Sequence, residues 1–277
     1  LKEFDTSLDP NLGVLNRDDF MVLADLVTRE YEFWESRHLD RIGAYELGRV
    51  LGRGSSGIVR ASIHVDTHER FAVKIIKKGK CSDLSRLDRE IQSLDTVSKH
   101  RNVVKLHEVL ENKDSLFIVM ELCGGGSLID ILRLYPEERL PEDVARSYMK
   151  QLFEALDYCH KMGVCHRDVR LENMLLSNDG ILKLTDFGHS GIYTPGWDIF
   201  QTSLVGSIFN LSPEQIAGNC YSGEKIDVWS AGIALFTVLV GTPPFYDENN
   251  AYLLQRIVEG VYEVPGFVSD DAFDLLQ

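Results

Sequence analysis

The sequence predicts an α+β protein built of two lobes, a small lobe rich in β-strands and a larger lobe that is mainly helical. Strand-like alternation dominates residues 45–121, and helical periodicity dominates from residue 127 onward. The run Gly124-Gly125-Gly126 stands between these halves and is typical of a joint. Because clefts between lobes are common ligand sites, we expect a ligand to bind at this joint.

The small lobe is expected to contain strands interrupted by one helix. Residues 58–65 and 70–76 alternate in polarity, and the sequence Asp66-Thr67-His68-Glu69 between them is a hairpin signal. Residues 85–96 then show helical spacing, and residues 103–110 and 115–121 predict two further strands.

The large lobe is expected to be built on long helices. Residues 141–160 carry an apolar stripe that starts at a proline, which is typical of a helix start. Residues 233–240 form the longest apolar run; because a bilayer span takes about 20 residues, we interpret this run as a buried helix.

Residues 1–44 are expected to form a helical extension ahead of both lobes. Residues 18–34 have apolar side chains at roughly helical spacing and begin with aspartate. We expect this helix to pack on the domain surface, and the alternative is a regulatory or partner-binding helix.

Composition excludes several classes of function. The 277 residues carry a net charge of −14 without a dense basic block, which argues against nucleic acid as the main partner and against a membrane-surface patch. The five cysteines form no C-x-x-C pair, so we expect reduced thiols in the cytoplasm or nucleus. We also expect no signal peptide and, because the sequence begins with Leu, a piece of a longer protein.

A glycine-rich segment precedes the first hairpin. Residues 52–59 read GRGSSGIV and match the spacing G-x-G-x-x-G-x-V. A dinucleotide fold needs a helix after the glycines, whereas a strand pattern follows here. We therefore expect a strand–turn–strand flap whose backbone N–H groups can approach phosphates, although glycines that mark only a turn remain an alternative.

One lysine interrupts an apolar strand in the segment Phe71-Ala72-Val73-Lys74. It is either an edge lysine that snorkels to water or an ammonium aimed at a phosphate. The second role needs a carboxylate that holds the ammonium in place, and Glu90 on the following predicted helix is suitable.

Polar side chains are concentrated in the stretch VCHRDVRLENMLL at residues 164–176. This is either a solvated turn between core elements or a set of groups that converge on a ligand. A hairpin that joins the neighbouring apolar runs would bring Asp168, Asn173 and Asp186 together. Two carboxylates and an amide suit a hard divalent cation that carries phosphates, and one carboxylate is then available to orient a nucleophile.

Taken in order, the glycine loop, FAVK, HRDVRLEN, DFG, SPE and DVWSAG resemble the motifs of eukaryotic protein kinases from about residue 45 to the end. HRDVRLEN and VLVGTPPF are similar to the calcium/calmodulin-dependent and Snf1/AMP-activated Ser/Thr kinase group. The resemblance implies the bilobal protein kinase fold, with a small lobe over residues 45–121, a hinge over 121–126 and a large lobe over 127–277.

The resemblance also implies roles for individual residues. Lys74, paired with Glu90, would hold the α- and β-phosphates of ATP, and Asp168 would orient the substrate hydroxyl. Asn173 and Asp186 would hold Mg²⁺. Arg170 would neutralise the γ-phosphate. The residues implied to contact the nucleotide are Gly52, Arg53, Gly54, Ser55, Ser56, Gly57, Val59, Ala72, Lys74, Met120, Glu121, Cys123, Leu175 and Asp186.

Supporting residues follow from the same resemblance. Met120 would be the gatekeeper, and Glu121 and Cys123 would offer backbone groups to adenine. Asp227 would brace the catalytic loop from a buried helix. A packed column linking the lobes would consist of Leu94, Leu106, His166 and Phe187.

The expected activity is that of an ATP-dependent protein Ser/Thr kinase, a phosphotransferase acting on protein substrates. A monomer is expected. An upstream kinase would act at Thr202 or Ser203, because in the family an arginine such as Arg167 pairs with a phosphorylated activation loop. The alternatives are a pseudokinase scaffold, a dual-specificity kinase and a small-molecule phosphotransferase. Lys74, Asp168 and Asp186 are all present, which argues against a pseudokinase, and the SPE motif and the long activation segment build a peptide platform, which argues against a small-molecule phosphotransferase.

Several positions depart from the family pattern. Arg170 stands where most Ser/Thr kinases have lysine and where some tyrosine kinases have arginine, but Glu172 and Ser207 favour Ser/Thr specificity. Glu172 matches a position that reads basic substrate residues, while Ser127 replaces a carboxylate often used for the same purpose. The sequence Ile-Phe-Asn at 208–210 changes the floor of the substrate site.

Glu214 raises a separate question. The family usually continues through further helices, one of which supplies an arginine that pairs with this glutamate. The sequence ends at residue 277 before such an arginine, and an unpaired, partly buried glutamate is costly, so we expect either that the segment lies outside this sequence or that another cation pairs with Glu214.

Overall fold

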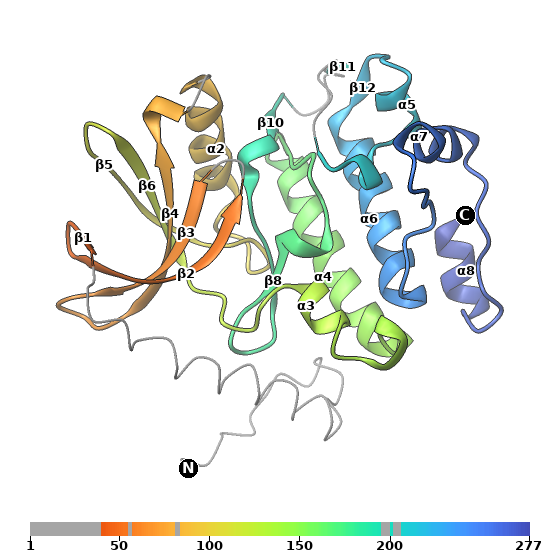
Figure 1. Ribbon diagram of the computed structural model, residues 1–277, viewed down its shortest axis with the longest axis horizontal. Helices are drawn as coiled ribbons and strands as arrows, with labels where there is room; N and C mark the ends of the chain where they lie inside the picture. The colour runs from red at the N-terminus through yellow and green to blue at the C-terminus, as the bar shows by residue number, and fades with distance from the viewer. Residues whose placement is uncertain (1–39, 55–56, 81–83, 195–199, 202–205) are drawn as a thin grey trace, which may run out of the picture.

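The computed structural model describes residues 40–54, 57–80, 84–194, 200–201 and 206–277. Within these residues the chain forms two lobes, a curled sheet with one helix and a mainly helical part (Figure 1). The predicted α+β, two-lobed architecture is therefore confirmed. The helix expected at residues 18–34 lies outside the described residues.

An antiparallel sheet forms the small lobe, in the order β1-β2-β3-β4-β6-β5. Its strands are β1 (Asp40–Ile42), β2 (Tyr45–Gly54), β3 (Gly57–His64), β4 (Arg70–Lys77), β5 (Leu106–Glu111) and β6 (Ser115–Glu121). In the centre of the sheet, Lys74 on β4 lies opposite Val59 on β3 and Ile118 on β6. This register carries the lysine into the middle of an apolar surface.

Two boundaries of the small lobe differ from the prediction. The prediction of a helical extension through residue 44 is wrong for its last residues, because Asp40–Ile42 is strand β1. This strand pairs with β2 across a turn in which Gly43 has φ +56°. The strand expected from residue 103 begins only at Leu106, because Val103 forms a bridge with Leu184 and the Val104 amide donates to the Leu184 carbonyl at 2.9 Å. The backbone at this point serves the other lobe.

One helix, α2 (Leu84–Val97), packs beside the sheet and faces the large lobe (Figure 1). Leu87, Leu94 and Val97 are buried and belong to the main hydrophobic cluster. That cluster extends across both lobes and includes Phe187 of the large lobe. Helix α2 therefore packs the small lobe against the segment of the large lobe that contains Phe187.

Two long helices, α4 and α6, form the centre of the large lobe. The helices are α3 (Leu128–Leu132), α4 (Glu142–Lys161), α5 (Pro213–Ile216), α6 (Gly223–Val240), α7 (Asn250–Glu259) and α8 (Asp270–Leu276). Helix α4 starts after Pro141 with Glu142 and Asp143 in its first turn, where negative charges interact favourably with the helix dipole. Helix α6 contains the predicted buried run and ends at Gly241, which has φ +90°. None of the described helices combines the length and apolarity that crossing a membrane requires.

Short strand pairs place the polar stretch between the lobes. The pairs are β7 (Val164–Cys165) with β10 (Gly191–Ile192), β8 (Met174–Leu176) with β9 (Leu182–Leu184), and β11 (Phe200–Gln201) with β12 (Tyr221–Ser222). The predicted hairpin between the apolar runs is the β8–β9 pair, in which Met174 lies opposite Leu184. The 3₁₀ turns are η2 (Lys78–Lys80), η3 (Pro136–Glu138), η4 (Leu171–Asn173), η5 (Phe187–His189) and η6 (Ile208–Asn210).

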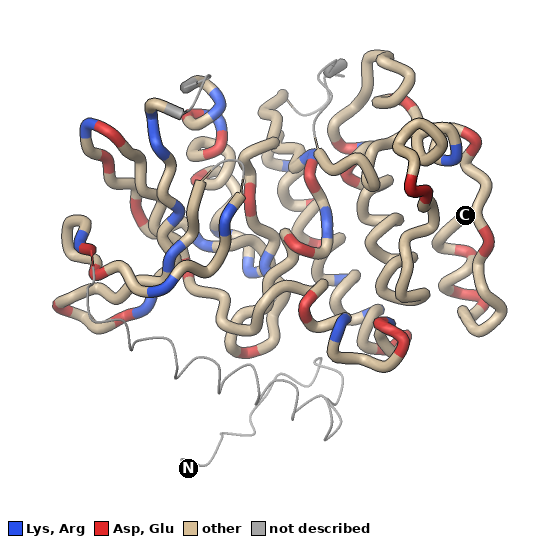
Figure 2. The backbone as a smooth tube through the Cα atoms, viewed as in Figure 1, with Lys and Arg blue, Asp and Glu red and all other residues tan. Residues whose placement is uncertain are grey.

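Charged residues are distributed over both lobes. Figure 2 shows Lys and Arg interspersed with Asp and Glu along the described chain rather than gathered on one element. The site described below therefore takes its charge from a few neighbouring side chains.

Candidate active site

The glycine-rich segment is a hairpin turn between β2 and β3, as the strand pattern predicted, with Gly54 opposite Gly57. Gly57 has φ +153°, and a Cβ there would lie 2.4 Å from the Ile75 carbonyl oxygen. Gly52 and Gly54 have open space where a Cβ would project. Only a glycine fits position 57, while positions 52 and 54 are not crowded by neighbouring atoms. Arg53 is exposed beside them, and the predicted Ser55 and Ser56 lie outside the described residues.

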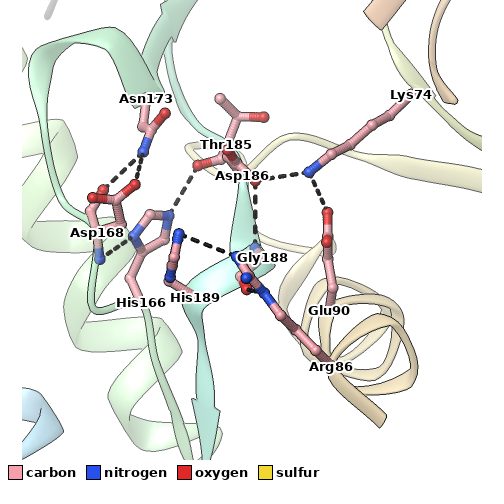
Figure 3. Close-up of polar contacts among 10 residues, drawn as sticks. All are labelled: Lys74, Arg86, Glu90, His166, Asp168, Asn173, Thr185, Asp186, Gly188 and His189. Carbon is pink, nitrogen blue, oxygen red and sulfur yellow. Dashed lines mark hydrogen bonds and ion pairs between the residues drawn. The ribbon is translucent and has the colours of Figure 1, made fainter. Parts of the chain in front are cut away.

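Lys74 is a buried, doubly paired ammonium and not a snorkelling edge lysine. Its Nζ lies 2.5 Å from Glu90 Oε1 on α2 and 2.8 Å from Asp186 Oδ1, which follows β9 (Figure 3). Burial alone would lower the pKa of Lys74, but the charges of Asp186 and Glu90 raise it overall. Burial alone would raise the pKa of Asp186, but Lys74 lowers it overall. Both groups therefore stay charged at neutral pH.

Asp168 and Asn173 form a second pair within the loop that joins β7 to β8. Asn173 Nδ2 donates to the Asp168 carbonyl at 2.8 Å and to Asp168 Oδ2 at 3.1 Å. The remaining oxygen, Asp168 Oδ1, is buried without a hydrogen-bond partner in the described part of the chain. A Cβ added to Gly206 would come within 3.6 Å of that oxygen. The free oxygen therefore faces the segment that follows residue 205.

Asp186 lies between these two pairs (Figure 3). The preceding residue, Thr185, donates its amide to the Asn173 carbonyl at 2.9 Å and accepts from His166 Nε2 at 2.9 Å. Asp186 itself has the left-handed backbone conformation φ +64°. The structure thus brings together Lys74, Glu90, Asp168, Asn173 and Asp186, which the sequence predicted to converge.

Asp227 holds the loop from helix α6. This fully buried carboxylate accepts from the His166 amide at 2.8 Å and from the Arg167 amide at 2.6 Å. It also accepts from His160 Nε2 of α4 at 2.8 Å. Arg167 adopts φ +63°, a conformation that costs free energy and persists only where the surrounding structure holds it. The hydrogen bonds from the His166 and Arg167 amides to Asp227 hold the backbone at this point.

The predicted column between the lobes is packed. His166 and Phe187 meet edge to face with ring centroids 4.8 Å apart, and both are buried. Leu94 is buried and Leu106 packs against the same cluster.

The residues expected to surround a purine come from strands β3, β4 and β6 of the small lobe and from β8 of the large lobe. Ala72 lies opposite Met120 in the sheet, and both are buried, whereas Val59 and Leu175 are half-buried. The Glu121 amide already donates to the Lys105 carbonyl at 3.0 Å, so only its carbonyl can serve a nucleotide. Burial, reinforced by Glu121, raises the pKa of Cys123 to about 12, so this thiol stays neutral.

Arg170 and Glu172, expected to serve phosphate and substrate separately, are paired with each other. Arg170 Nη2 lies 2.5 Å from Glu172 Oε1, and Arg170 Nε lies 2.9 Å from Glu172 Oε2. Ser127 caps helix α3 in a capping box with Asp130. In this structure Ser127 therefore stabilises the start of helix α3.

The segment on the substrate side differs from expectation in its contacts. Within the described residues, no hydrogen bond joins Ser207 to Asp168. Instead, Asn210 Nδ2 donates to the Val169 carbonyl at 2.9 Å, so the unusual sequence at 208–210 binds the catalytic loop directly. Glu214 forms no ion pair with any described side chain.

The proposed phosphorylation sites Thr202 and Ser203 lie outside the described residues. The Arg167 guanidinium, expected to receive their phosphate, donates from Nε to the His189 carbonyl and from Nη2 to the Ser190 carbonyl, each at 2.7 Å.

Sequence reasoning missed a group of contacts between α2 and η5. Arg86 Nε donates to the Gly188 carbonyl at 2.7 Å, and Arg86 Nη2 donates to His189 Nε2 at 3.1 Å. Burial, followed by the charge of Arg86, lowers the pKa of His189 and keeps its ring neutral. Arg86 lies one helical turn before Glu90, and this spacing was the only signal that both face the site.

Comparison with known proteins agrees with this geometry. A family model described as "Protein kinase domain" matches residues 45–276. The human SNF-related serine/threonine-protein kinase is 38% identical over 237 residues, which cover 84% of this chain and 30% of that protein. CBL-interacting serine/threonine-protein kinase 1 of Arabidopsis thaliana is 38% identical over 257 residues, which cover 91% of this chain and 57% of that protein. The chain thus spans only part of the relatives it matches.

Proposed function

The chain belongs to the protein kinase family, and from this premise we propose that it transfers the γ-phosphoryl group of ATP to Ser or Thr hydroxyls of proteins. One observation carries the proposal: Asp168 Oδ1 is buried without a partner among the described residues. Leaving a buried polar group unsatisfied costs about 1–3 kcal/mol, and more for a charged one. A substrate hydroxyl is a donor of the size and chemistry that would satisfy this oxygen.

The donor set around Asp186 suits Mg²⁺. Asp186 uses Oδ1 for Lys74, and Asn173 turns its amide nitrogen toward Asp168, so each keeps an oxygen for a hard cation. No cluster of three or more His, Cys, Asp or Glu side chains suited to a metal occurs in the described ranges. Asn173 and Asp186 would therefore hold the ion together with phosphate oxygens. When bound, Mg²⁺ neutralises charge on the phosphates.

The protein side chains supply position and charge. Glu90 fixes the Lys74 ammonium, which offers its charge to the α- and β-phosphates of the substrate ATP. Asp168 orients the acceptor hydroxyl and accepts its proton, while Asn173 Nδ2 keeps that carboxylate in place. The glycine hairpin covers the phosphates closely because no side chains intervene. Phosphoryl transfer depends mainly on such positioning and on electrostatic stabilisation.

A single assay tests this function. The protein would be incubated with Mg²⁺, labelled ATP and matched peptide libraries that offer Ser, Thr or Tyr. We expect label on Ser and Thr peptides, and a loss of about 10²–10⁴-fold in Asp168→Asn because the proton acceptor is gone. Asp157→Asn removes an exposed aspartate on α4 that pairs with Lys161, and it serves as the matched control.

Two results would overturn the proposal. The first is a wild-type rate retained by Asp168→Asn, and the second is a wild type that binds ATP without labelling any peptide. The second result would favour a pseudokinase that acts as a scaffold. Label on Tyr peptides would instead indicate dual specificity, which the sequence suggests because some tyrosine kinases have arginine at the position of Arg170.

We propose in addition that an upstream kinase phosphorylates Thr202 or Ser203. The support is Arg167, whose guanidinium is fixed at the start of this segment by the His189 and Ser190 carbonyls. A phosphate would bind such a cation by charge-assisted hydrogen bonds. Full activity in a Thr202→Ala/Ser203→Ala double variant would contradict the proposal.

A further inference from the structure

Arg170 and Glu172 form a bidentate ion pair in the loop that also carries Asp168 and Asn173. Two guanidinium N–H groups of Arg170 meet both carboxylate oxygens of Glu172, at 2.9 Å and 2.5 Å. Arg170 precedes η4 in an extended conformation, and Glu172 lies within η4. A planar fork that matches both oxygens is the geometry that arginine provides and lysine does not.

The same two side chains have other electrostatic partners. The hydrogen bond to Glu172 has the largest effect on the pKa of Arg170 and raises it, and the negative charges of Asp168 and Asp186 also raise it. Burial alone would raise the pKa of Glu172, but the hydrogen bond from Arg170 and, to a smaller extent, the charge of Arg133 at the end of α3 lower it. The side chain of Glu172 is 49% exposed, so a ligand from solvent can reach it.

We propose that Arg170 is an internal ligand of Glu172 which a cationic side chain of the protein substrate displaces. A substrate arginine can offer Glu172 the same fork that Arg170 now provides. Once displaced, Arg170 is released toward Asp168, Asp186 and the γ-phosphate of ATP. This inference rests on the proposed function and makes Arg170 a specificity-determining residue, because its exchange links recognition of a basic substrate to phosphoryl transfer.

The exchange has a distinctive energetic consequence. A cationic side chain of the substrate can pair with Glu172 only by breaking the Arg170–Glu172 pair. The difference in Kd between basic and neutral peptides should therefore be small. Exposed ion pairs typically change an equilibrium constant by about 1.4- to 5-fold. The released Arg170, by contrast, stabilises charge on the transferring group, so the larger benefit should appear in kcat.

Binding is measured first, without chemistry. Peptides would carry Ala in place of the acceptor and a single arginine at each flanking position in turn, with citrulline as the neutral isostere of arginine. Fluorescence anisotropy gives Kd with Mg²⁺ and a non-hydrolysable ATP analogue present. For the best position we expect the citrulline-to-arginine Kd ratio to be about twofold in wild type.

The variants then separate the partners. Arg170→Lys breaks the fork but keeps the charge, so the ratio should rise to about fivefold. Glu172→Gln removes the acceptor, so the ratio should fall to about one. Arg133→Lys makes the same exchange at an exposed arginine beside Glu172 and should keep the wild-type ratio. An unchanged ratio in Arg170→Lys, or a retained ratio in Glu172→Gln, overturns the proposal.

Turnover provides a readout that a merely structural role would not change. In Glu172→Gln the Arg170 guanidinium has lost its ion pair even when the peptide carries no arginine. The kcat on the citrulline peptide should therefore rise to the kcat on the arginine peptide. Wild type should keep a difference between the two peptides in kcat. If wild type transfers phosphate but Glu172→Gln leaves that difference intact, the exchange fails and the kinase function stands. If wild type labels no peptide, the kinase function fails, and the binding ratios still decide the exchange.

Discussion

Lys74 joins two carboxylates that come from different lobes. Glu90 belongs to the small lobe and Asp186 to the large one, and one ammonium contacts both at 2.5 Å and 2.8 Å. A buried charge of this kind is tolerated only when its partners are in place, because breaking a buried pair costs about 3–5 kcal/mol. The two ion pairs of Lys74 therefore depend on the arrangement of the two lobes.

The lowered pKa of Asp186 predicts how its contribution to stability depends on pH. A carboxyl whose folded pKa is depressed stabilises the fold above its unfolded pKa, about 3.9, and loses that contribution as pH falls through the folded value. Asp186→Asn should therefore lower the free energy of unfolding at pH 7 by on the order of 1 kcal/mol, because the side chain is partly exposed. The difference from wild type should shrink as pH falls below about 4.

Urea unfolding followed by fluorescence between pH 8 and pH 3 measures that difference. Asp179→Asn, which removes an exposed aspartate from the turn between β8 and β9, is the control for loss of a surface carboxylate. A difference between Asp186→Asn and wild type that stays constant down to pH 3 would contradict the assigned ion pair.

The hairpin of β2 and β3 is an element whose shape depends on one residue. Gly57→Ala would force a side chain into φ +153° and bring its Cβ to 2.4 Å from the Ile75 carbonyl. We expect a loss of about 1–3 kcal/mol in the free energy of unfolding. Gly54→Ala has open space and should cost less. Equal losses in the two variants, measured by urea unfolding, would show that the close approach to Ile75 does not matter.

Helix α2 docks on the segment after Asp186 through a buried hydroxyl pair. Ser190 Oγ donates to Ser93 Oγ at 2.8 Å, although the two residues are 97 positions apart. Either single alanine variant leaves a buried hydroxyl unsatisfied and should cost about 1–3 kcal/mol, whereas the double variant removes both polar groups. The double variant should therefore cost less than the sum of the singles. Additive losses in a double-mutant cycle would contradict this coupling.

Long-range pairs of this kind explain where prediction from sequence ended. Periodicity located β4, β6 and α4 to within a residue or two, because each buries one regular face. It did not find the Ser93–Ser190 or Arg86–His189 contacts, because isolated polar residues have no period and their partners depend on how α2 docks. The late start of the strand expected from residue 103 has a similar origin, because the bridge between Val103 and Leu184 of the large lobe depends on how the lobes pack and not on local periodicity.

The candidate site was predictable in membership but less so in geometry. The motifs identified Lys74, Asp168, Asn173 and Asp186. Asn173 and Asp186 flank the predicted β8–β9 hairpin, so their closeness followed from that hairpin. The motifs also placed Arg170 two residues from Glu172, but closeness in sequence does not say whether two side chains meet. Their bidentate contact depends on the extended backbone at Arg170, which only the structure shows.

At the scale of the whole molecule, a nucleotide bound between the lobes should stabilise both at once. A ligand that binds only the folded state at 100 times its Kd adds about 2.7 kcal/mol, which for a chain of this size raises Tm by about 5–10 °C. We expect this shift with Mg²⁺ and a non-hydrolysable ATP analogue, and its reversal by EDTA. Asp186→Asn should abolish the shift because the metal loses a ligand, while Asp168→Asn should keep it because Asp168 faces the acceptor hydroxyl.

Thermal unfolding of the wild type and both variants, with Asp157→Asn as the surface control, therefore separates holding the nucleotide from orienting the substrate. If Asp168→Asn lost the shift as completely as Asp186→Asn, Asp168 would belong with the metal ligands and its free oxygen would need another explanation. If the wild type showed no shift at all, the Lys74, Asn173 and Asp186 side chains would be joined by packing between the lobes and not by a shared ligand.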